Sequence, residues 1–130
     1  MLAFILISAL DALWHLVIFG KRYKVGVIKV ANIKNGRISI NIISGIISQI
    51  FVVTAIEILV FLNFGTSASY LQAAVVGALS GILAISVYGL VNYALIKNWR
   101  FDITLLEVIW GPILGASSGL LIAYLYYLLR

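Results

Sequence analysis

The sequence holds 130 residues, of which 64% are hydrophobic and only 10% are charged, and its mean hydropathy is +1.17. A soluble domain of this size cannot bury so many apolar side chains, so the composition indicates an integral membrane protein. Cysteine is absent, which excludes disulfides, thiolate metal sites and cysteine nucleophiles. The net charge of +5 comes from residues that flank apolar segments, and no basic face typical of nucleic-acid binding is present.

Four apolar stretches follow one another along the chain, over residues 2–20, 38–62, 70–96 and 103–129. Each is long enough to cross the hydrocarbon core of a bilayer as a helix. The first lacks a basic start and a small-residue cleavage site, so we expect a span there rather than a signal peptide. The single proline and the scattered glycines favour helices over a lipid-facing barrel. The sequence therefore predicts one all-α transmembrane domain, residues 1–130, folded as a membrane four-helix bundle.

Basic residues are distributed unevenly between the two sides of these stretches. Only Arg130 lies on one side, and the other side holds Lys21, Arg22, Lys24, Lys29, Lys34, Arg37, Lys97 and Arg100. The positive-inside rule makes the basic connections cytoplasmic, so we expect a multi-pass protein of the cell membrane with both termini on the non-cytoplasmic side. The basic residues of the first connection, beginning with Lys21, Arg22 and Lys24, are also candidates for binding anionic lipid headgroups. Setting the topology alone is the simpler interpretation.

Glycines recur at four-residue spacing in the last two stretches. They are Gly77 and Gly81 in the third and Gly111, Gly115 and Gly119 in the fourth. Between helices solvated by lipid, small residues favour association because they let two backbones approach closely. We expect these two stretches to pack against each other, although such ridges also serve packing between separate chains.

Polar residues gather in the cytoplasmic half of the apolar stretches. Ionisable groups are costly in hydrocarbon, so they face protein or water. Six polar residues form the candidate cluster: Asp11, His15, Tyr88, Asn92, Glu107 and Trp110. At about 1.5 Å per helical residue, the deeper three lie roughly 12 to 14 Å from the cytoplasmic helix ends: Asp11, Tyr88 and Trp110. The other three lie roughly 6 to 8 Å from those ends: His15, Asn92 and Glu107. Glu57 lies near the opposite leaflet and stands apart.

The cluster has two interpretations. It is either a hydrogen-bond network that fixes the register of the helices, or a site that relays protons or holds a small polar ligand. One histidine without cysteines fits neither a metal site nor a catalytic triad. We therefore expect no metal, no cofactor and no catalytic residues, and we lean away from an enzyme.

Two segments resemble a family of small bacterial four-span membrane proteins known only as a domain of unknown function. The first is the Asp-Ala-Leu-Trp element at residues 11–14. The second comprises Tyr88, Asn92, Ala94, Lys97, Trp99, Thr104, Glu107, Trp110 and Gly111. This chain departs from the family pattern at Gly89 and Glu107, where the family usually has aspartates, and at His15, where an apolar residue is common. The resemblance implies the topology and a site at these positions, but it implies no activity.

For function, the sequence favours a non-catalytic packing or accessory subunit of a larger membrane complex, because small-residue ridges are plentiful and catalytic constellations are missing. The alternative is a small oligomeric transporter or proton-linked carrier that uses the buried polar cluster. Four short spans leave little room for a pathway in one copy, which is why the carrier would need to be an oligomer. An enzyme acting on lipid comes third. The expected partners are the lipid bilayer and other membrane subunits or further copies of the chain, and no nucleic acid.

Overall fold

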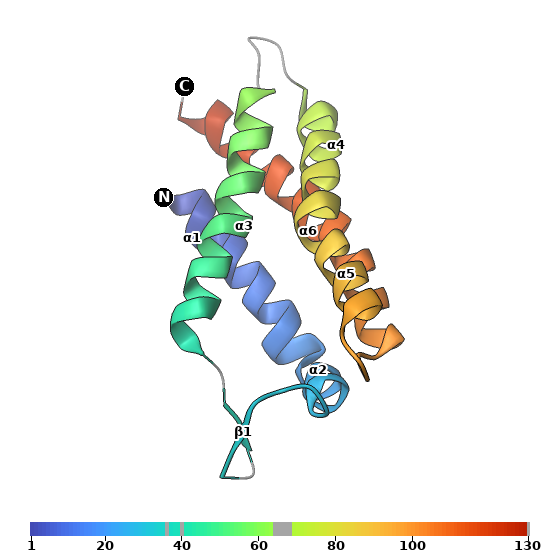
Figure 1. The fold of residues 1–130 in the computed structure, drawn as a ribbon. Helices are drawn as coiled ribbons and strands as arrows, with labels where there is room; N and C mark the ends of the chain where they lie inside the picture. The colour runs from blue at the N-terminus through green and yellow to red at the C-terminus, as the bar shows by residue number, and fades with distance from the viewer. Residues whose placement is uncertain (36, 40, 64–68, 130) are drawn as a thin grey trace.

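The computed structural model describes residues 1–35, 37–39, 41–63 and 69–129, and this part of the chain is mostly helical (Figure 1). Arg130 and most of the second connection, residues 64–68, lie outside the described residues. In chain order the elements are α1 (Leu2–Ala12), the π-helical segment η1 (Leu13–Ile18), α2 (Gly20–Val27), β1 (Ile33–Lys34), β2 (Arg37–Ile38), α3 (Ile42–Leu62), α4 (Tyr70–Gly81), the π-helical segment η2 (Ile82–Ser86), α5 (Val87–Leu95) and α6 (Phe101–Leu128).

Three of the described helices are long and apolar enough to cross a membrane: α3, the continuous helix Tyr70–Leu95 and α6. The helix Leu2–Ile18 makes a fourth candidate when it is taken together with α2 as one bent span. Large apolar side chains cover the outer surface, among them Leu16, Phe51 and Leu83, each about 70% exposed. Only lipid solvates such a surface favourably, so the fold is that of an all-α membrane protein with three to four spans.

The first stretch is shorter than expected. The helix ends at Ile18 rather than at residue 20, and α2 leaves it at an angle of 73°. The turn falls at Phe19, whose backbone N–H donates to the carbonyl of Trp14 at 3.0 Å, five residues back. Basic side chains follow directly, and charged groups are expensive in hydrocarbon. The chain therefore bends where its apolar run stops.

The second stretch also begins later than expected. Ile38 pairs with Ile33 in the short antiparallel hairpin β1–β2 instead of starting a helix. The helix α3 begins at Ile42 because Asn41 caps it, and the Asn41 side chain accepts a hydrogen bond of 3.1 Å from the backbone N–H of Ser44. The helices of the third and fourth stretches, Tyr70–Leu95 and Phe101–Leu128, lie within two residues of the expected bounds.

The helices α4 and α6 pack with their backbones in contact. A Cβ atom added at Gly77 would overlap the carbonyl oxygen of Gly115, and one added at Gly81 would overlap that of Gly111. The same holds at Gly119, where the obstacle is the carbonyl of Ala73 on α4. Any side chain at these positions would push the helices apart. The glycine ridges thus lie at a contact within one chain.

Pro112 lies inside α6 without ending it. Its ring nitrogen carries no hydrogen, so the carbonyl of Val108 lacks its usual partner in the helix. The hydroxyl of Ser86, in η2, donates to that carbonyl at 3.2 Å. A neighbouring hydroxyl is one of the means by which membrane helices accommodate proline.

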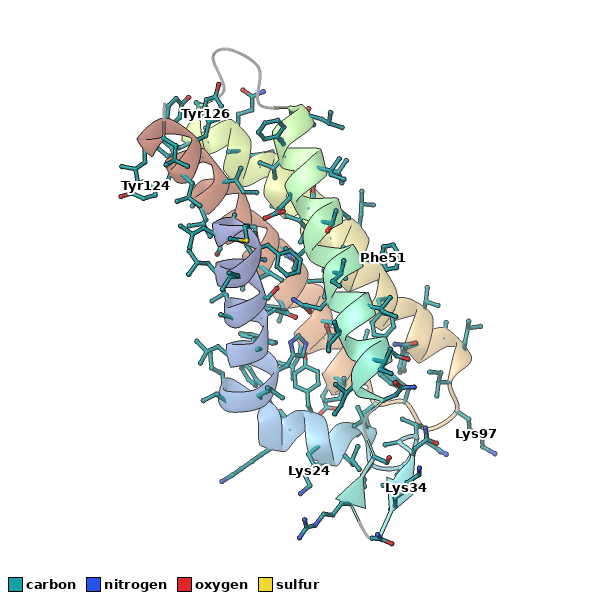
Figure 2. The ribbon with its side chains drawn as sticks, turned by 90° about the vertical axis from the view of Figure 1, so that its left-hand side faces the viewer. Lys24, Lys34, Phe51, Lys97, Tyr124 and Tyr126 are labelled. Atoms are coloured by element: carbon teal, nitrogen blue, oxygen red, sulfur yellow. The ribbon has the colours of Figure 1, made fainter. Side chains whose placement is uncertain are left out.

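The two ends of the molecule differ in chemistry (Figure 2). Lys24, Lys34 and Lys97 lie at one end, which we call the basic end, and Tyr124 and Tyr126 lie at the opposite, tyrosine end. Both chain termini lie toward the tyrosine end (Figure 1). Between the two ends, α1, α3, η2 and α6 share a hydrophobic core of Ile7, Val53, Ile56, Val60, Ile85, Trp110, Leu114 and Ile122.

Candidate functional site

Four of the six residues in the predicted polar cluster meet at the interface between the first helix and α6. The indole Nε1 of Trp110 donates to Asp11 Oδ1 at 2.7 Å. His15 Nδ1 lies 3.3 Å from the same carboxylate oxygen and 3.0 Å from the Asp11 carbonyl. The other ring nitrogen of His15, Nε2, lies 3.4 Å from Glu107 Oε1. One imidazole thus lies between two carboxylates that come from different helices.

Helical spacing explains why these side chains converge. Asp11 and His15 are four residues apart and Glu107 and Trp110 are three apart, so each pair lies on one helix face. The α6 pair is the more deeply buried, with Glu107 6% and Trp110 3% exposed. The side chains of Asp11 and His15 keep 15% and 29% of their surface exposed. The α6 pair therefore forms the floor of the site, and the first helix forms its more accessible side.

Aromatic side chains hold the cluster in place. Trp14 stacks on Trp110 with ring centroids 4.3 Å apart and an angle of 7° between the planes. Its Nε1 lies 3.4 Å from the hydroxyl of Tyr23, to which it donates. The Tyr23 ring in turn lies 4.7 Å from the His15 ring. The helix α2 therefore contributes to the site through Tyr23, even though the rest of that segment is basic.

A cavity of about 480 Å³ lies beside the cluster, toward the basic end. Every helical segment except α4 contributes to its wall, and the chemistry-bearing residues there are Asp11, His15, Tyr23, Gln49, Tyr88 and Glu107. The structure thus places Tyr88 at the cavity, although its side chain is 59% exposed and makes no hydrogen bond within the described ranges. Asn92 does not line this cavity, and its Nδ2 has no hydrogen-bond partner among the described residues.

Sequence reasoning missed Tyr23 and Gln49. Tyr23 stands between basic residues in a segment expected to be a connection, and only the bend at Phe19 turns its ring back toward His15. Gln49 follows Ser48 in the mainly apolar second stretch, and this pair of adjacent polar residues was the signal available for it. The Gln49 amide lies beside the Asp11 carboxylate. Its Nε2 atom is buried, however, and no acceptor among the described residues lies in hydrogen-bonding position for it.

Gly89 and Glu107, where the resemblance leads one to expect aspartates in the family, lie against each other. A Cβ atom added at Gly89 would lie 2.7 Å from the Cβ of Glu107. Glu107, whose side chain is one methylene longer than that of aspartate, thus occupies space that a side chain at position 89 would need. Thr104 fixes the same pair of helices, because its hydroxyl donates to the Gly89 carbonyl at 3.2 Å and accepts from Trp99 Nε1 at 3.2 Å.

The candidate headgroup residues Lys21, Arg22 and Lys24 are all exposed on α2. The helix rests on α6 through Gly26, where an added Cβ would collide with Ile103. Arg22 Nε lies 3.9 Å from Asp102 Oδ2, which leaves its charge partly matched. Asp102 also accepts two hydrogen bonds, of 2.8 and 2.9 Å, from Arg100, and these bonds raise the pKa of the Arg100 guanidinium. Lys21 and Lys24 are therefore the less engaged members of the group.

Within the described ranges, no group of three or more His, Cys, Asp or Glu side chains has a geometry that could hold a metal ion. What the site offers is acid–base and hydrogen-bonding chemistry at a cavity wall. These features define a class: a small polytopic α-helical membrane protein with a polar site between its helices.

The chain belongs to the family described as predicted membrane protein (DUF2177), whose sequence model matches residues 1–125. The function of this family is unknown. The match confirms the resemblance found in the sequence. No curated protein and no solved structure matches the chain.

Proposed function

We propose that the protein is a small proton-linked solute carrier whose binding site is the cavity beside Asp11, His15 and Glu107. The observation that carries this proposal is the His15 imidazole, which faces a carboxylate at each ring nitrogen, at 3.3 and 3.4 Å. An imidazole can accept a proton at one ring nitrogen and release one from the other. Chains of His, Asp and Glu inside a membrane typically mark proton or substrate pathways.

The packing of α4 on α6 favours this proposal over an accessory subunit. The sequence favoured an accessory subunit because its glycine ridges could also pack against a different chain. Those ridges meet inside one chain, at Gly77 with Gly115 and at Gly81 with Gly111, so they supply no surface for another subunit. Packing within the chain thus explains the glycine ridges, but it does not explain the polar cavity. A network that only fixed helix register would not require an open space of about 480 Å³ beside it.

The position of the site along the helices fits a carrier that opens toward the basic end. By the positive-inside rule this end faces the cytoplasm, and four spans then place both termini outside. The helix α2 covers part of the cavity with Tyr23 and Val27. We expect several copies to assemble, because four short helices enclose little space for a path through one copy.

Solute-driven currents test the proposal. The purified protein is reconstituted in liposomes adsorbed on a sensor membrane, and defined panels of amines, amino acids, sugars and carboxylates are applied at several pH values. At least one panel should evoke a saturable current or an accompanying pH change in the lumen. Asp11→Asn and Glu107→Gln should abolish it, since an amide cannot exchange a proton.

The matched control is Glu57→Gln, an acid in a span that lies at a separate cavity with Ile58 and Ile122. This variant should transport normally. A folded protein that gives no response to any panel, or responses that survive both site variants, would refute the carrier.

A further inference from the structure

We infer that the cavity binds the ammonium group of an organic cation. This inference rests on the site assigned to the proposed carrier and names the chemistry of its ligand. The juxtaposition behind it is a pair of carboxylates, Asp11 and Glu107, that line the same cavity as three aromatic side chains, Tyr23, Tyr88 and Trp99.

The charged groups at the cavity wall disfavour an anionic ligand. The titratable groups with ion-pair partners at the cavity wall are Asp11, His15 and Glu107, and no Lys or Arg from the described residues lines it. The wall therefore carries two acidic side chains, one imidazole and no permanently cationic group among the described residues. Carboxylates buried away from water are costly unless they are paired, and a cationic ligand supplies such a partner. A neutral solute would not.

The aromatic wall favours an organic ammonium over a hydrated metal ion. Aromatic faces carry negative electrostatic potential and attract cations within about 6 Å of the ring centre, most strongly once the cation has shed its water. Their carbon surfaces also suit the alkyl part of an amine. The volume of about 480 Å³ lies in the ordinary range for small-molecule sites.

Gln49, whose amide lies beside the Asp11 carboxylate, adds a further polar group to the cavity wall. Its Nε2 atom is buried at the cavity wall and makes no hydrogen bond of full geometry in the described part of the chain. Buried polar atoms in folded proteins are nearly always paired. An acceptor on the ligand, such as the hydroxyl of an amino alcohol, would complete this amide while the ammonium faces the carboxylates.

The same ammonium chemistry has two sources, a free amine and the headgroup of an aminophospholipid. Binding is therefore measured in two lipid backgrounds, nanodiscs of phosphatidylglycerol alone and nanodiscs with added phosphatidylethanolamine. The chain reports on its own site, because each of its three tryptophans lies at the cluster or the cavity: Trp110 bonds to Asp11, Trp14 stacks on Trp110, and Trp99 lines the wall.

The experiment titrates ethylammonium and ethanolamine at constant ionic strength and follows tryptophan fluorescence, with acetate and ethylene glycol as charge controls. A saturable change with the amines alone is expected in phosphatidylglycerol. Asp11→Asn and Glu107→Gln should raise the half-saturating concentration about tenfold or more, because each removes a charged partner of the ammonium. Glu57→Gln should leave it unchanged. Thermal unfolding and size-exclusion profiles of each variant show that the fold is intact.

If phosphatidylethanolamine alone shifts the fluorescence and suppresses the response to soluble amines, the ammonium comes from lipid. No response in either background, or a response that both site variants retain, overturns the inference. Currents evoked by sugars or carboxylates without amine binding would leave the carrier standing and reject the cation. Amine binding without any current would support the organic cation as ligand and reject the carrier.

Discussion

At the scale of single residues, the Asp11 carboxylate organises the site. It accepts the indole N–H of Trp110 at 2.7 Å and lies 3.3 Å from His15 Nδ1, so two polar groups from two helices depend on it. A buried donor such as the Trp110 indole N–H costs free energy when it loses its acceptor. The carboxylate therefore has a structural role that can be separated from its charge.

Asp11→Ala should destabilise the protein by about 1 to 2 kcal/mol, because Trp110 Nε1 is left without an acceptor. Asp11→Asn should cost much less, since the amide oxygen still accepts from the indole. Thermal unfolding in one detergent or lipid mixture measures both. Equal melting temperatures for the Ala and Asn variants would show that this hydrogen bond contributes nothing to stability.

Glu107 shows how one residue depends on its neighbour's lack of a side chain. Gly89 leaves the space in which the Glu107 methylene groups pack, and Thr104 ties the same turn of α5 to α6 with a 3.2 Å hydrogen bond. The position of the acid is thus set by a glycine on another helix. Sequence spacing along α6 alone gives no hint of this dependence.

At the scale of elements, α4 and α6 make the most extensive contact among the helices and strands that the structure describes. Glycines on each helix face backbone carbonyls of the other, which allows an approach that no larger residue permits. One turn further on, Ser86 donates to the Val108 carbonyl that Pro112 leaves without a partner. The pair thereby gains both close backbone contacts and a hydrogen bond at the turn that Pro112 interrupts.

Gly81→Leu and Gly115→Leu should each destabilise the fold by about 3 kcal/mol or more, because the new side chain meets backbone that cannot move aside. Gly45→Leu is the matched control, since a Cβ atom there has nothing within 4 Å. Unfolding temperature and size-exclusion profile report the outcome. If all three variants behave alike, the glycines do not form the helix contact.

At the scale of the whole molecule, the two ends differ in charge: Lys24, Lys34 and Lys97 lie at one end, and Tyr124 and Tyr126 lie at the other (Figure 2). The labelled lysines lie at the end that carries α2 and the hairpin, away from the end toward which both termini lie (Figures 1 and 2). Tyrosine is enriched at membrane interfaces, and Lys and Arg are enriched on the cytoplasmic side. This asymmetry gives a definite orientation to test.

Cysteines introduced at Lys34 in the hairpin and at Asn63 after α3 should label from opposite sides of the membrane. The chain contains no native cysteine, so each reports alone. A membrane-impermeant thiol reagent applied to intact cells should reach Asn63→Cys at once and Lys34→Cys only after permeabilisation. Labelling of both from outside in intact cells would contradict the four-span topology.

The sequence by itself determined the membrane class, the approximate helices and four of the residues that meet in the polar site, Asp11, His15, Glu107 and Trp110. These features are readable because hydrophobic length, charge asymmetry and helical spacing act locally, through the solvent that each segment prefers. Asp11 with His15, and Glu107 with Trp110, were identifiable as pairs because residues three or four apart share a helix face.

Only the tertiary structure decided which of these residues meet. It separated Asn92 from the cavity and brought in Tyr23, whose place depends on a 73° bend, and Gln49, which belongs to a helix with few buried residues. It also placed the glycine ridges at a contact within the chain rather than between chains. Helix rotation and crossing arise from many weak contacts between distant segments, and no pattern along one segment encodes them.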